Sequence, residues 1–188
     1  IDALGYNQRS GEPFSLESTP SLWTSSLGYD VDHHSLNYTR LLKVGVNGIL
    51  EAIARQAARP GLSEAQRDFL QAAERSNQAL LQIAGKFGQK AAEMLPFAPD
   101  EDARACLALI AATAPRIPAE PPRTFYEGLA ALWFLREATA TLDAVGISVV
   151  GHLDRLLIDL YRADLASGVL TEAKARDLLA RWMMPTDI

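Results

Sequence analysis

Paired cysteines are missing from this 188-residue chain, because Cys106 is its single cysteine. A secreted fold held together by internal disulfides is therefore excluded. Long apolar runs are missing as well. No stretch approaches the ~20 residues that span a bilayer, and no charged segment followed by an apolar run opens the chain. We therefore expect no membrane span and a cytoplasmic setting.

A basic surface is also missing. The chain has 18 Lys and Arg against 23 Asp and Glu, a formal net charge of −5, and both signs are scattered along it. It lacks the clustered positive charge of a nucleic-acid-binding protein, so we expect no nucleic-acid partner. With 48% hydrophobic residues the chain is long enough to bury one core, and we expect one folded domain.

Cys106 lies in the stretch Ala-Arg-Ala-Cys-Leu-Ala-Leu-Ile (103–110), an apolar helical pattern with no histidine nearby. Reactive thiols need an electropositive and partly open setting, which this pattern does not offer. We therefore expect Cys106 to be a buried core thiol.

Two adjacent histidines, His33 and His34, stand in Tyr-Asp-Val-Asp-His-His-Ser-Leu-Asn-Tyr (29–38). Adjacent side chains diverge in any regular backbone, whereas zinc-binding histidines normally lie three to five residues apart. We expect no metal site here. A catalytic base and a simple helix start both remain open for this stretch.

Helical periodicity dominates the chain after its first thirty residues, which read as an irregular segment (1–30). A β-branched run bounded by glycines, 145–150, is the one plausible strand. The predicted fold is mainly α, with at most one or two short strands. Capping residues, prolines and glycines place the helices at about 36–58, 63–95, from 100 to a stop at Pro115, from 124 past 135, 152–167 and 171–184.

Apolar spacing also predicts which helix faces are buried. In the first helix, Gly45 and Gly48 either weaken the helix or permit close packing. The helix that contains Trp133 and Phe134 is apolar almost all round, so we expect it to be buried on most sides. The stripe expected to be buried in the long helix is Phe69, Leu70, Ala73, Leu80, Ala84, Phe87, Ala91 and Met94.

Several separated motifs occur in an order that resembles a known family. They are Pro-Pro-Arg-Thr-Phe-Tyr-Glu-Gly-Leu (121–129), Trp-Phe (133–134), Gly-His-Leu-Asp (151–154) and Asp-Leu-Ala-Ser-Gly-Val-Leu-Thr-Glu-Ala (164–173). The order is similar to that of the pyruvate formate-lyase domain of the glycyl radical enzymes, over about residues 28–185. The Pro-Pro-Arg-Thr-Phe turn favours the dehydratase and lyase branch over formate acetyltransferase. The resemblance implies an incomplete helical domain at 31–188, the N-terminal portion of an α/β barrel.

The resemblance implies a thiyl-radical mechanism in which a backbone glycine stores the radical and a loop cysteine abstracts a substrate hydrogen. This chain has neither a Gly-Cys-x-Glu loop nor an Arg-Val-x-Gly-Tyr segment. We therefore expect no catalytic residue and no cofactor within it, and place the glycyl radical in a C-terminal part outside it. The chain begins at isoleucine, and both ends look cut. The implied partners are a small-molecule substrate, a radical-SAM activating enzyme and a second subunit in a homodimer.

The resemblance also answers the question about the histidine pair. By position, His34 matches a histidine that lies at the substrate pocket, where it hydrogen-bonds a hydroxyl or moves a proton. Asn37, Tyr38 and Ser148 are the other substrate-binding candidates. A role in packing or in starting the helix stays open for His34.

The sequence departs from the family pattern both around His34 and around Ser148. His33 stands where glycine is usual, and Asn37 where aspartate is usual. Val149 and His152 replace the first and last residues of a Ser-x-Gly-Arg pattern, so Ser148 serves only after a shift of one residue, which turns a strand side chain to the other face. These departures favour the alternative function, a degenerate stand-alone helical binding or scaffold module without catalysis.

Overall fold

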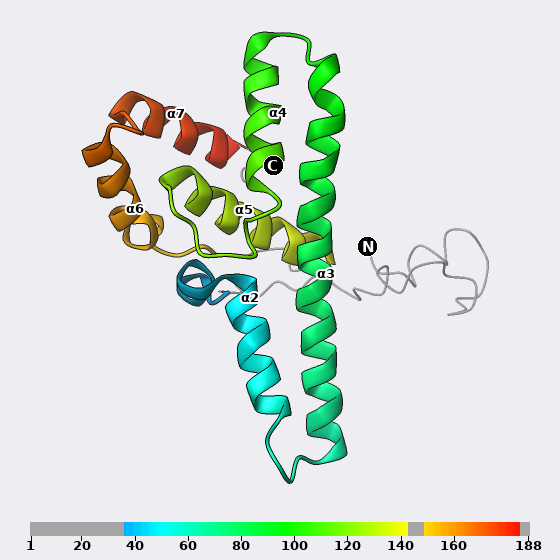
Figure 1. Ribbon diagram of the computed structural model, residues 1–188. Helices are drawn as coiled ribbons and strands as arrows, with labels where there is room; N and C mark the ends of the chain where they lie inside the picture. The colour runs from blue at the N-terminus through cyan, green and yellow to red at the C-terminus, as the bar shows by residue number, and fades with distance from the viewer. Residues whose placement is uncertain (1–35, 143–148, 185–188) are drawn as a thin grey trace, which may run out of the picture. The chain divides into compact units, whose positions relative to one another are not determined.

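The computed structural model describes residues 36–142 and 149–184, and its regular elements in these ranges are helices only (Figure 1). The predicted mainly helical fold is confirmed. The predicted irregular segment at 1–30 and most of the predicted strand at 145–150 lie outside the described residues. The elements are α2 (Tyr38–Ala57), α3 (Glu64–Met94), the short 3₁₀-helix η3 (Leu95–Phe97), α4 (Glu101–Thr113), α5 (Phe125–Leu142), α6 (Leu153–Ser167) and α7 (Glu172–Met183).

Helix ends follow the predicted capping signals. Ser63 Oγ accepts a hydrogen bond from the Gln66 amide at 3.2 Å, and Gln66 Oε1 accepts one from the Ser63 amide at 2.9 Å, so the predicted capping box opens α3. The Asp100 carboxylate caps α4. Gly168 ends α6 with φ 76°, a left-handed conformation that glycine adopts without strain. Caps of this kind contribute about 1 kcal/mol each.

The chain divides into two compact units, residues 1–36 with 135–151 and residues 37–134 with 152–188. The described part of the first unit is mainly the second half of α5, where Thr139 Oγ1 donates to the Leu135 carbonyl at 2.8 Å. The second unit contains the other helices and the first half of α5. The side chains of the pocket and of the polar network described below all belong to it.

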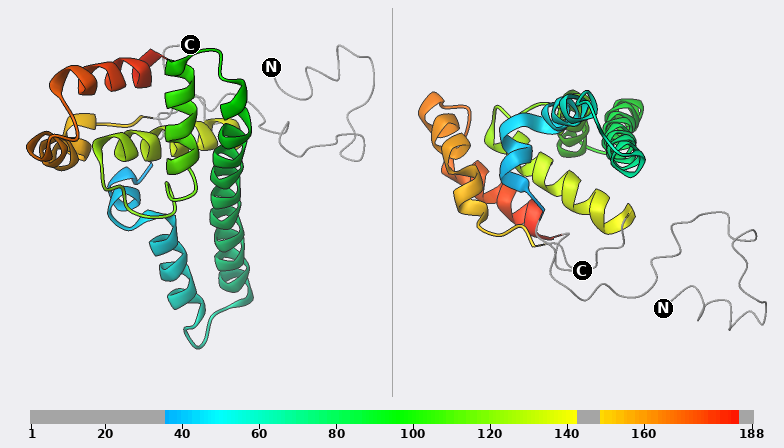
Figure 2. Two further views of the ribbon diagram at one scale, coloured as in Figure 1. Left: turned by 45° about the horizontal axis from the view of Figure 1, so that its top comes forward. Right: turned by 90° about the horizontal axis from the view of Figure 1, so that it is seen from below.

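Within the second unit, α3 is the long helix against which two others lie. α2 runs beside its N-terminal half and α4 beside its C-terminal half (Figures 1 and 2). Short connections at 58–63 and 98–100 join them, so both neighbours run antiparallel to α3.

The predicted buried stripe of α3 is only partly correct. Ala84 and Ala91 are buried, but Phe69, Phe87 and Met94 are 72%, 51% and 46% exposed. The fully buried residues of α3 are all small, namely Ala84, Gly88 and Ala91. Gly88, for example, has Pro115 so close that an added Cβ would lie 3.0 Å from its Cδ. Leu70, Ala73 and Leu80 are half-buried, so the stripe is covered in part, while Phe69, Phe87 and Met94 lie outside the covered row.

The core of the second unit forms around α5, the helix whose apolar sequence predicted that it would be buried. Leu129 and Leu132 are buried, Leu132 completely, and Leu157 of α6 is buried as well. Gly128 permits this approach, because an added Cβ would lie 2.6 Å from Leu157 Cδ2. Trp133 is half-buried, as is its neighbour Phe134, because both side chains line an open pocket.

Candidate functional site

The predicted substrate-binding residues begin at the start of α2. The Asn37 side chain caps this helix, its Oδ1 accepting a hydrogen bond from the Arg40 amide at 3.0 Å. Asn37 is exposed, whereas Tyr38 is buried at 2% exposure. His34 and Ser148 lie outside the described residues. The structure therefore places Asn37 and Tyr38 side by side at one helix end.

α2 is not a continuous helix. Gly45 breaks it with φ 64° and ψ 178°, and the second half starts again against a loop that precedes α5. The Val46 amide donates to the Pro118 carbonyl at 2.9 Å, and the Asn47 amide donates to the Ala119 carbonyl at 3.0 Å. Of the two alternatives for Gly45, close packing is confirmed, because an added Cβ would lie 2.3 Å from Ala119 O.

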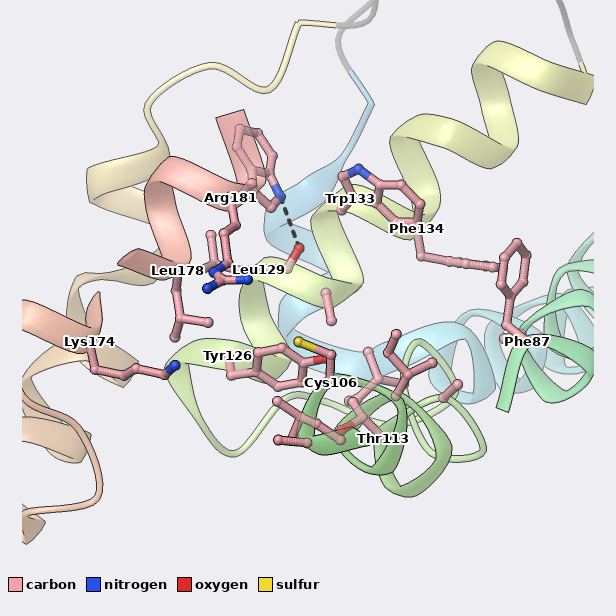
Figure 3. A pocket seen from close by; sticks show the side chains of 18 of the residues that line it. Phe87, Cys106, Thr113, Tyr126, Leu129, Trp133, Phe134, Lys174, Leu178 and Arg181 are labelled. Atoms are coloured by element: carbon pink, nitrogen blue, oxygen red, sulfur yellow. Dashed lines mark hydrogen bonds between the residues drawn. The ribbon is translucent and has the colours of Figure 1, made fainter. Parts of the chain in front are cut away.

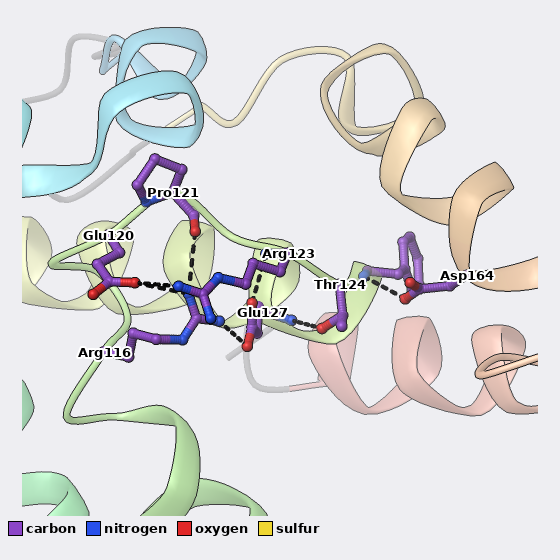
Figure 4. Close-up of polar contacts among 8 residues, drawn as sticks. Arg116, Glu120, Pro121, Arg123, Thr124, Glu127 and Asp164 are labelled. Atoms are coloured by element: carbon purple, nitrogen blue, oxygen red, sulfur yellow. Dashed lines mark hydrogen bonds and ion pairs between the residues drawn. The ribbon is translucent and has the colours of Figure 1, made fainter. Parts of the chain in front are cut away.

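The loop that receives α2 is held by a network of ionic side chains (Figure 4). The Arg116 guanidinium pairs with Glu127 and, at 3.4 Å, with Glu120. It also donates to the Pro121 carbonyl at 3.3 Å. The Arg123 side chain donates to Glu120 at 2.9 Å, and its amide donates to Glu127 at 2.6 Å. The network thus clamps both sides of the Pro-Pro-Arg-Thr-Phe turn.

Electrostatics keep this clamp ionised. Burial by itself raises the pKa of Glu127, but the hydrogen bonds from Arg116 and from the Arg123 amide leave that pKa below its ordinary value. The hydrogen bond to Glu127 raises the pKa of Arg116. Both groups are therefore charged at neutral pH, and they pair in a half-buried position, with side chains 21% and 16% exposed.

The start of α5 has a second anchor from a distant part of the chain. Asp164, which is 6% exposed, accepts a hydrogen bond from the Phe125 amide at 2.7 Å (Figure 4). Thr124 Oγ1 accepts one from the Glu127 amide at 3.2 Å. A carboxylate at a helix N-terminus also interacts favourably with the helix dipole. Asp164 therefore fastens α6 to the first turn of α5.

An apolar pocket of about 700 Å³ opens beside these elements, between α3, α4, α5 and α7 (Figure 3). Its aromatic walls include an edge-to-face contact of Phe87 with Phe134, with ring centroids 6.3 Å apart. The aromatic lining residues are Phe87, Tyr126, Trp133, Phe134 and Trp182, and the aliphatic ones are Ala84, Ala105, Leu109, Ile110, Ala114, Ile117, Leu129, Ala130 and Leu178.

Polar groups are few in the pocket. Trp182 Nε1 donates to the Leu129 carbonyl at 3.1 Å, so this indole N–H is already used. Burial raises the pKa of Tyr126, and the nearby Cys106 raises it further. The charged lining residues are Asp102, which is exposed, and Lys174 and Arg181, whose side chains are 60% and 56% exposed, so all three lie at the rim. Thr113, which is buried, adds one hydroxyl to the lining. The pocket thus has an apolar interior and a charged edge.

Cys106 is also a lining residue, and the expectation that it is a buried core thiol is wrong, because the residue is exposed. α4 packs against α3 on one side only, and its other side faces the pocket, so helical periodicity did not reveal which apolar residues are covered.

Cys106 shares the pocket lining with the carboxylate of Asp102, which lies four residues earlier on α4. In the part of the chain that the structure describes, no group of three or more His, Cys, Asp or Glu side chains is arranged to hold a metal. None of its helices is long and apolar enough to cross a membrane.

Comparison with known proteins decides the family. The family model described as pyruvate formate lyase-like matches residues 21–187. The chain belongs to this family. Because this match covers most of the chain, it includes the described helices, the Gly45 break and the clamp around Arg116.

Relatives of this pyruvate formate lyase-like chain lie in the dehydratase and lyase branch, as the resemblance predicted. It is 31% identical over 149 residues to the isethionate sulfite-lyase of Desulfovibrio desulfuricans, which is 76% of this chain and 18% of that enzyme. A glycyl radical enzyme from Archaeoglobus fulgidus superposes with a TM-score of 0.71 and 26% identity, over 80% of this chain and 20% of that one. Hydroxyproline dehydratase from Clostridioides difficile superposes with a TM-score of 0.69 and 26% identity, over 78% of this chain and 19% of that one. The chain thus spans about a fifth of the length of these relatives.

Sequence reasoning missed the features that join distant segments of this family member. The partnership of Arg116 with Glu127 had no local signal, because the two stand on opposite sides of the proline-rich turn. Asp164 lies in the Asp-Leu-Ala-Ser-Gly motif (164–168), but no local sequence signal indicates its bond to the Phe125 amide. The pocket itself depends on how four helices meet. Neither Asn37 nor Tyr38 lines it.

Proposed function

We propose that this chain is the N-terminal part of a glycyl radical enzyme of the dehydratase or lyase type, where it forms outer helices and one wall of the substrate pocket. The observation that carries the proposal is the family match over residues 21–187, combined with an alignment to only about a fifth of each relative. A domain that matches relatives along most of its own length, yet covers so little of theirs, is best explained as one portion of a longer enzyme.

This chain does not supply the radical centre. It has no Gly-Cys-x-Glu loop and no Arg-Val-x-Gly-Tyr segment, and its one cysteine belongs to the apolar lining of a pocket on α4. In the proposed enzyme the radical chemistry belongs to the C-terminal part, with the glycyl radical stored there. The residues of this chain bind the substrate and orient it.

The substrate wall would consist of His34, Asn37, Tyr38 and Ser148. The support for this set is the match to the family pattern, with the exposure of Asn37 at the end of α2. Its Oδ1 is engaged in capping, whereas its amide Nδ2 donates no hydrogen bond among the described residues and is available to a substrate oxygen. The rigid loop contact at Gly45 would hold that helix end in place.

The proposed enzyme would act on a small molecule, be activated by a radical-SAM enzyme, form a homodimer and work in the cytoplasm. Family membership supports the substrate class and the activating enzyme.

The coding sequence that follows Ile188 tests the proposal directly. A reading frame that continues into a Gly-Cys-x-Glu loop and a C-terminal glycine motif would support it. A stop codon directly after Ile188 would refute it and favour the alternative, a stand-alone helical scaffold module without catalysis. The departures at His33, Asn37, Val149 and His152 favour that alternative, because each changes a position that the family uses near its pocket.

A further inference from the structure

Arg116 stands at the start of the turn that receives α2, and its side chain has a role beyond stabilising that turn. We propose that Arg116 is a positioning residue, which holds the turn 116–120 in the shape that directs the first half of α2 and so places Asn37 and Tyr38 in the substrate wall. This inference rests on the proposed function, and it names the residue on which the geometry of that wall depends.

The hydrogen-bond ladder of α2 is diverted at Gly45. In an uninterrupted α-helix, the two amides that follow this residue would donate to carbonyls four residues earlier in the same helix. Here the Val46 amide donates to the Pro118 carbonyl at 2.9 Å, and the Asn47 amide donates to the Ala119 carbonyl at 3.0 Å. Because Gly45 itself is not helical, α2 does not carry its own direction across the break. The turn that accepts these two amides therefore sets that direction.

Apolar contacts hold the first half of α2 on the domain without fixing its angle. Tyr38 and Leu41 are each 2% exposed. The gain from apolar burial is non-directional, whereas a hydrogen bond weakens steeply as its angle departs from linear. The place of Asn37, which precedes this half-helix directly, therefore depends on the two hydrogen bonds at the break.

Arg116 closes the turn through its main chain and through its side chain. Its carbonyl accepts a hydrogen bond from the Glu120 amide at 2.8 Å, which brackets the two carbonyls that receive α2. Its guanidinium pairs with Glu127 and, at 3.4 Å, with Glu120, and it donates to the Pro121 carbonyl at 3.3 Å (Figure 4). A planar guanidinium offers its donors in a rigid fork, whereas a lysine ammonium is a point charge on a flexible stem. Arg116→Lys therefore keeps the charge and loses the shape of the clamp.

The angle of α2 across its break can be measured directly. Thr39 and Ala57 are exposed and lie on opposite sides of Gly45 in the sequence of α2. Cys106 is the single cysteine of the 188-residue chain, so Cys106→Ala gives a background in which Thr39→Cys and Ala57→Cys carry two spin labels. Pulsed electron paramagnetic resonance then gives the distribution of distances between the labels. We expect Arg116→Lys to broaden this distribution or to shift its maximum.

Arg136→Lys is the matched control. The Arg136 side chain is 20% exposed and pairs with Glu137, the next residue of α5, whereas the Arg116 side chain is 21% exposed. The same substitution at the same degree of burial should leave the label distribution unchanged. If Arg116→Lys lowers the helix content in circular dichroism, Glu120→Gln replaces it, because the Glu120 side chain is 44% exposed and forms one arm of the clamp.

Turnover tests the consequence for the substrate wall. The assay uses the longer product of a reading frame that carries the radical motifs, with isethionate and trans-4-hydroxy-L-proline as the two probes. A displacement of about 1 Å caused far from the chemistry can lower a rate by about 10²-fold. Arg116→Lys should therefore lower kcat by up to about 10²-fold and change KM less, whereas Arg136→Lys should change neither. A purely structural role would instead lower stability in urea and leave kcat unchanged.

Each result has a distinct meaning. A label distribution that Arg116→Lys leaves unchanged would overturn the positioning role and leave the proposed function standing. Equal broadening by Arg116→Lys and Arg136→Lys would also overturn it, because the cause would then be a general loss of stability. Broadening by Arg116→Lys with an unchanged kcat would separate α2 from the substrate and refute the proposal. A stop codon directly after Ile188 would refute the proposed function and the link to a substrate, while the labels would still decide whether Arg116 directs α2.

Discussion

Replacing Gly45 by alanine tests the most constrained contact in the domain. Its φ of 64° with ψ of 178° falls in a region that is essentially restricted to glycine, and occupying it costs a side chain about 1–3 kcal/mol. The new Cβ would also lie 2.3 Å from Ala119 O and 2.8 Å from Glu120 Cα. Both are backbone atoms, so the loop itself must move.

That movement adds a second contribution. The loop receives the amides of Val46 and Asn47 at 2.9 and 3.0 Å, and a shift weakens both hydrogen bonds, each with a net value of about 0.5–1.5 kcal/mol. Together with the backbone strain, the expected loss for Gly45→Ala is about 2–6 kcal/mol, a large part of the stability of a typical domain.

Urea titration followed by circular dichroism at 222 nm measures this loss, and two other glycines serve as controls. Gly61 has φ 78° but nothing within 4 Å of an added Cβ, so Gly61→Ala should cost only the strain, about 1–2 kcal/mol. Gly85 lies inside α3 with open space around it, so Gly85→Ala should stabilise by about 0.5–1 kcal/mol. If Gly45→Ala and Gly61→Ala unfold at the same urea concentration, the close approach of the loop contributes nothing and the reasoning is wrong.

Three further outcomes are expected. Leu132→Ala should cost about 2–5 kcal/mol in the same titration, because Leu132 is completely buried, and a loss below about 0.5 kcal/mol would place it at the surface. Since the pKa of Glu127 is lowered on folding, the Arg116–Glu127 pair stabilises the chain above the ordinary glutamate pKa, and that contribution disappears as pH falls through the folded value. Glu127→Gln should therefore lower stability at pH 7 and flatten its decline below about pH 4.5, whereas parallel profiles would show that Glu127 is not the titrating group. In a full-length enzyme, His34→Ala should lower turnover by about 10²- to 10⁴-fold while His33→Ala has little effect, and small equal effects on turnover would remove His34 from the substrate pocket.

The fold could be predicted from sequence where its causes are local. Ser63 and Gln66 are three residues apart and cap each other, and Gly168 stops α6 through its own backbone preference, so both helix ends were predicted. Which face of a helix is buried depends on the helices that pack against it, and these are distant in the sequence. Phe69 and Phe87 match the apolar periodicity of α3 and yet are exposed, because the residues that the neighbouring helices cover fully are Ala84, Gly88 and Ala91.

The candidate site also has a part that the sequence predicted and a part that depends on the packing of distant helices. Asn37 was predicted as a pocket residue from its place in a motif, and the structure adds that its side chain caps α2. Its role toward a substrate remains a prediction, as do those of Tyr38, His34 and Ser148. The pocket around Cys106 was not predictable from one sequence, because four helices far apart in the chain build it and the apolar pattern of α4 is the same whether that face is covered or open.

The bond between Asp164 and the Phe125 amide has a consequence for how the protein forms on the ribosome. The donor of this bond is synthesised 39 residues before its acceptor, which at about 5–20 residues per second is a delay of about 2–8 seconds. During that interval the first turn of α5 has only its local caps, and its apolar sides have no α6 to pack against. The first turn of α5 is therefore fastened only after α6 has been synthesised and has left the ribosome.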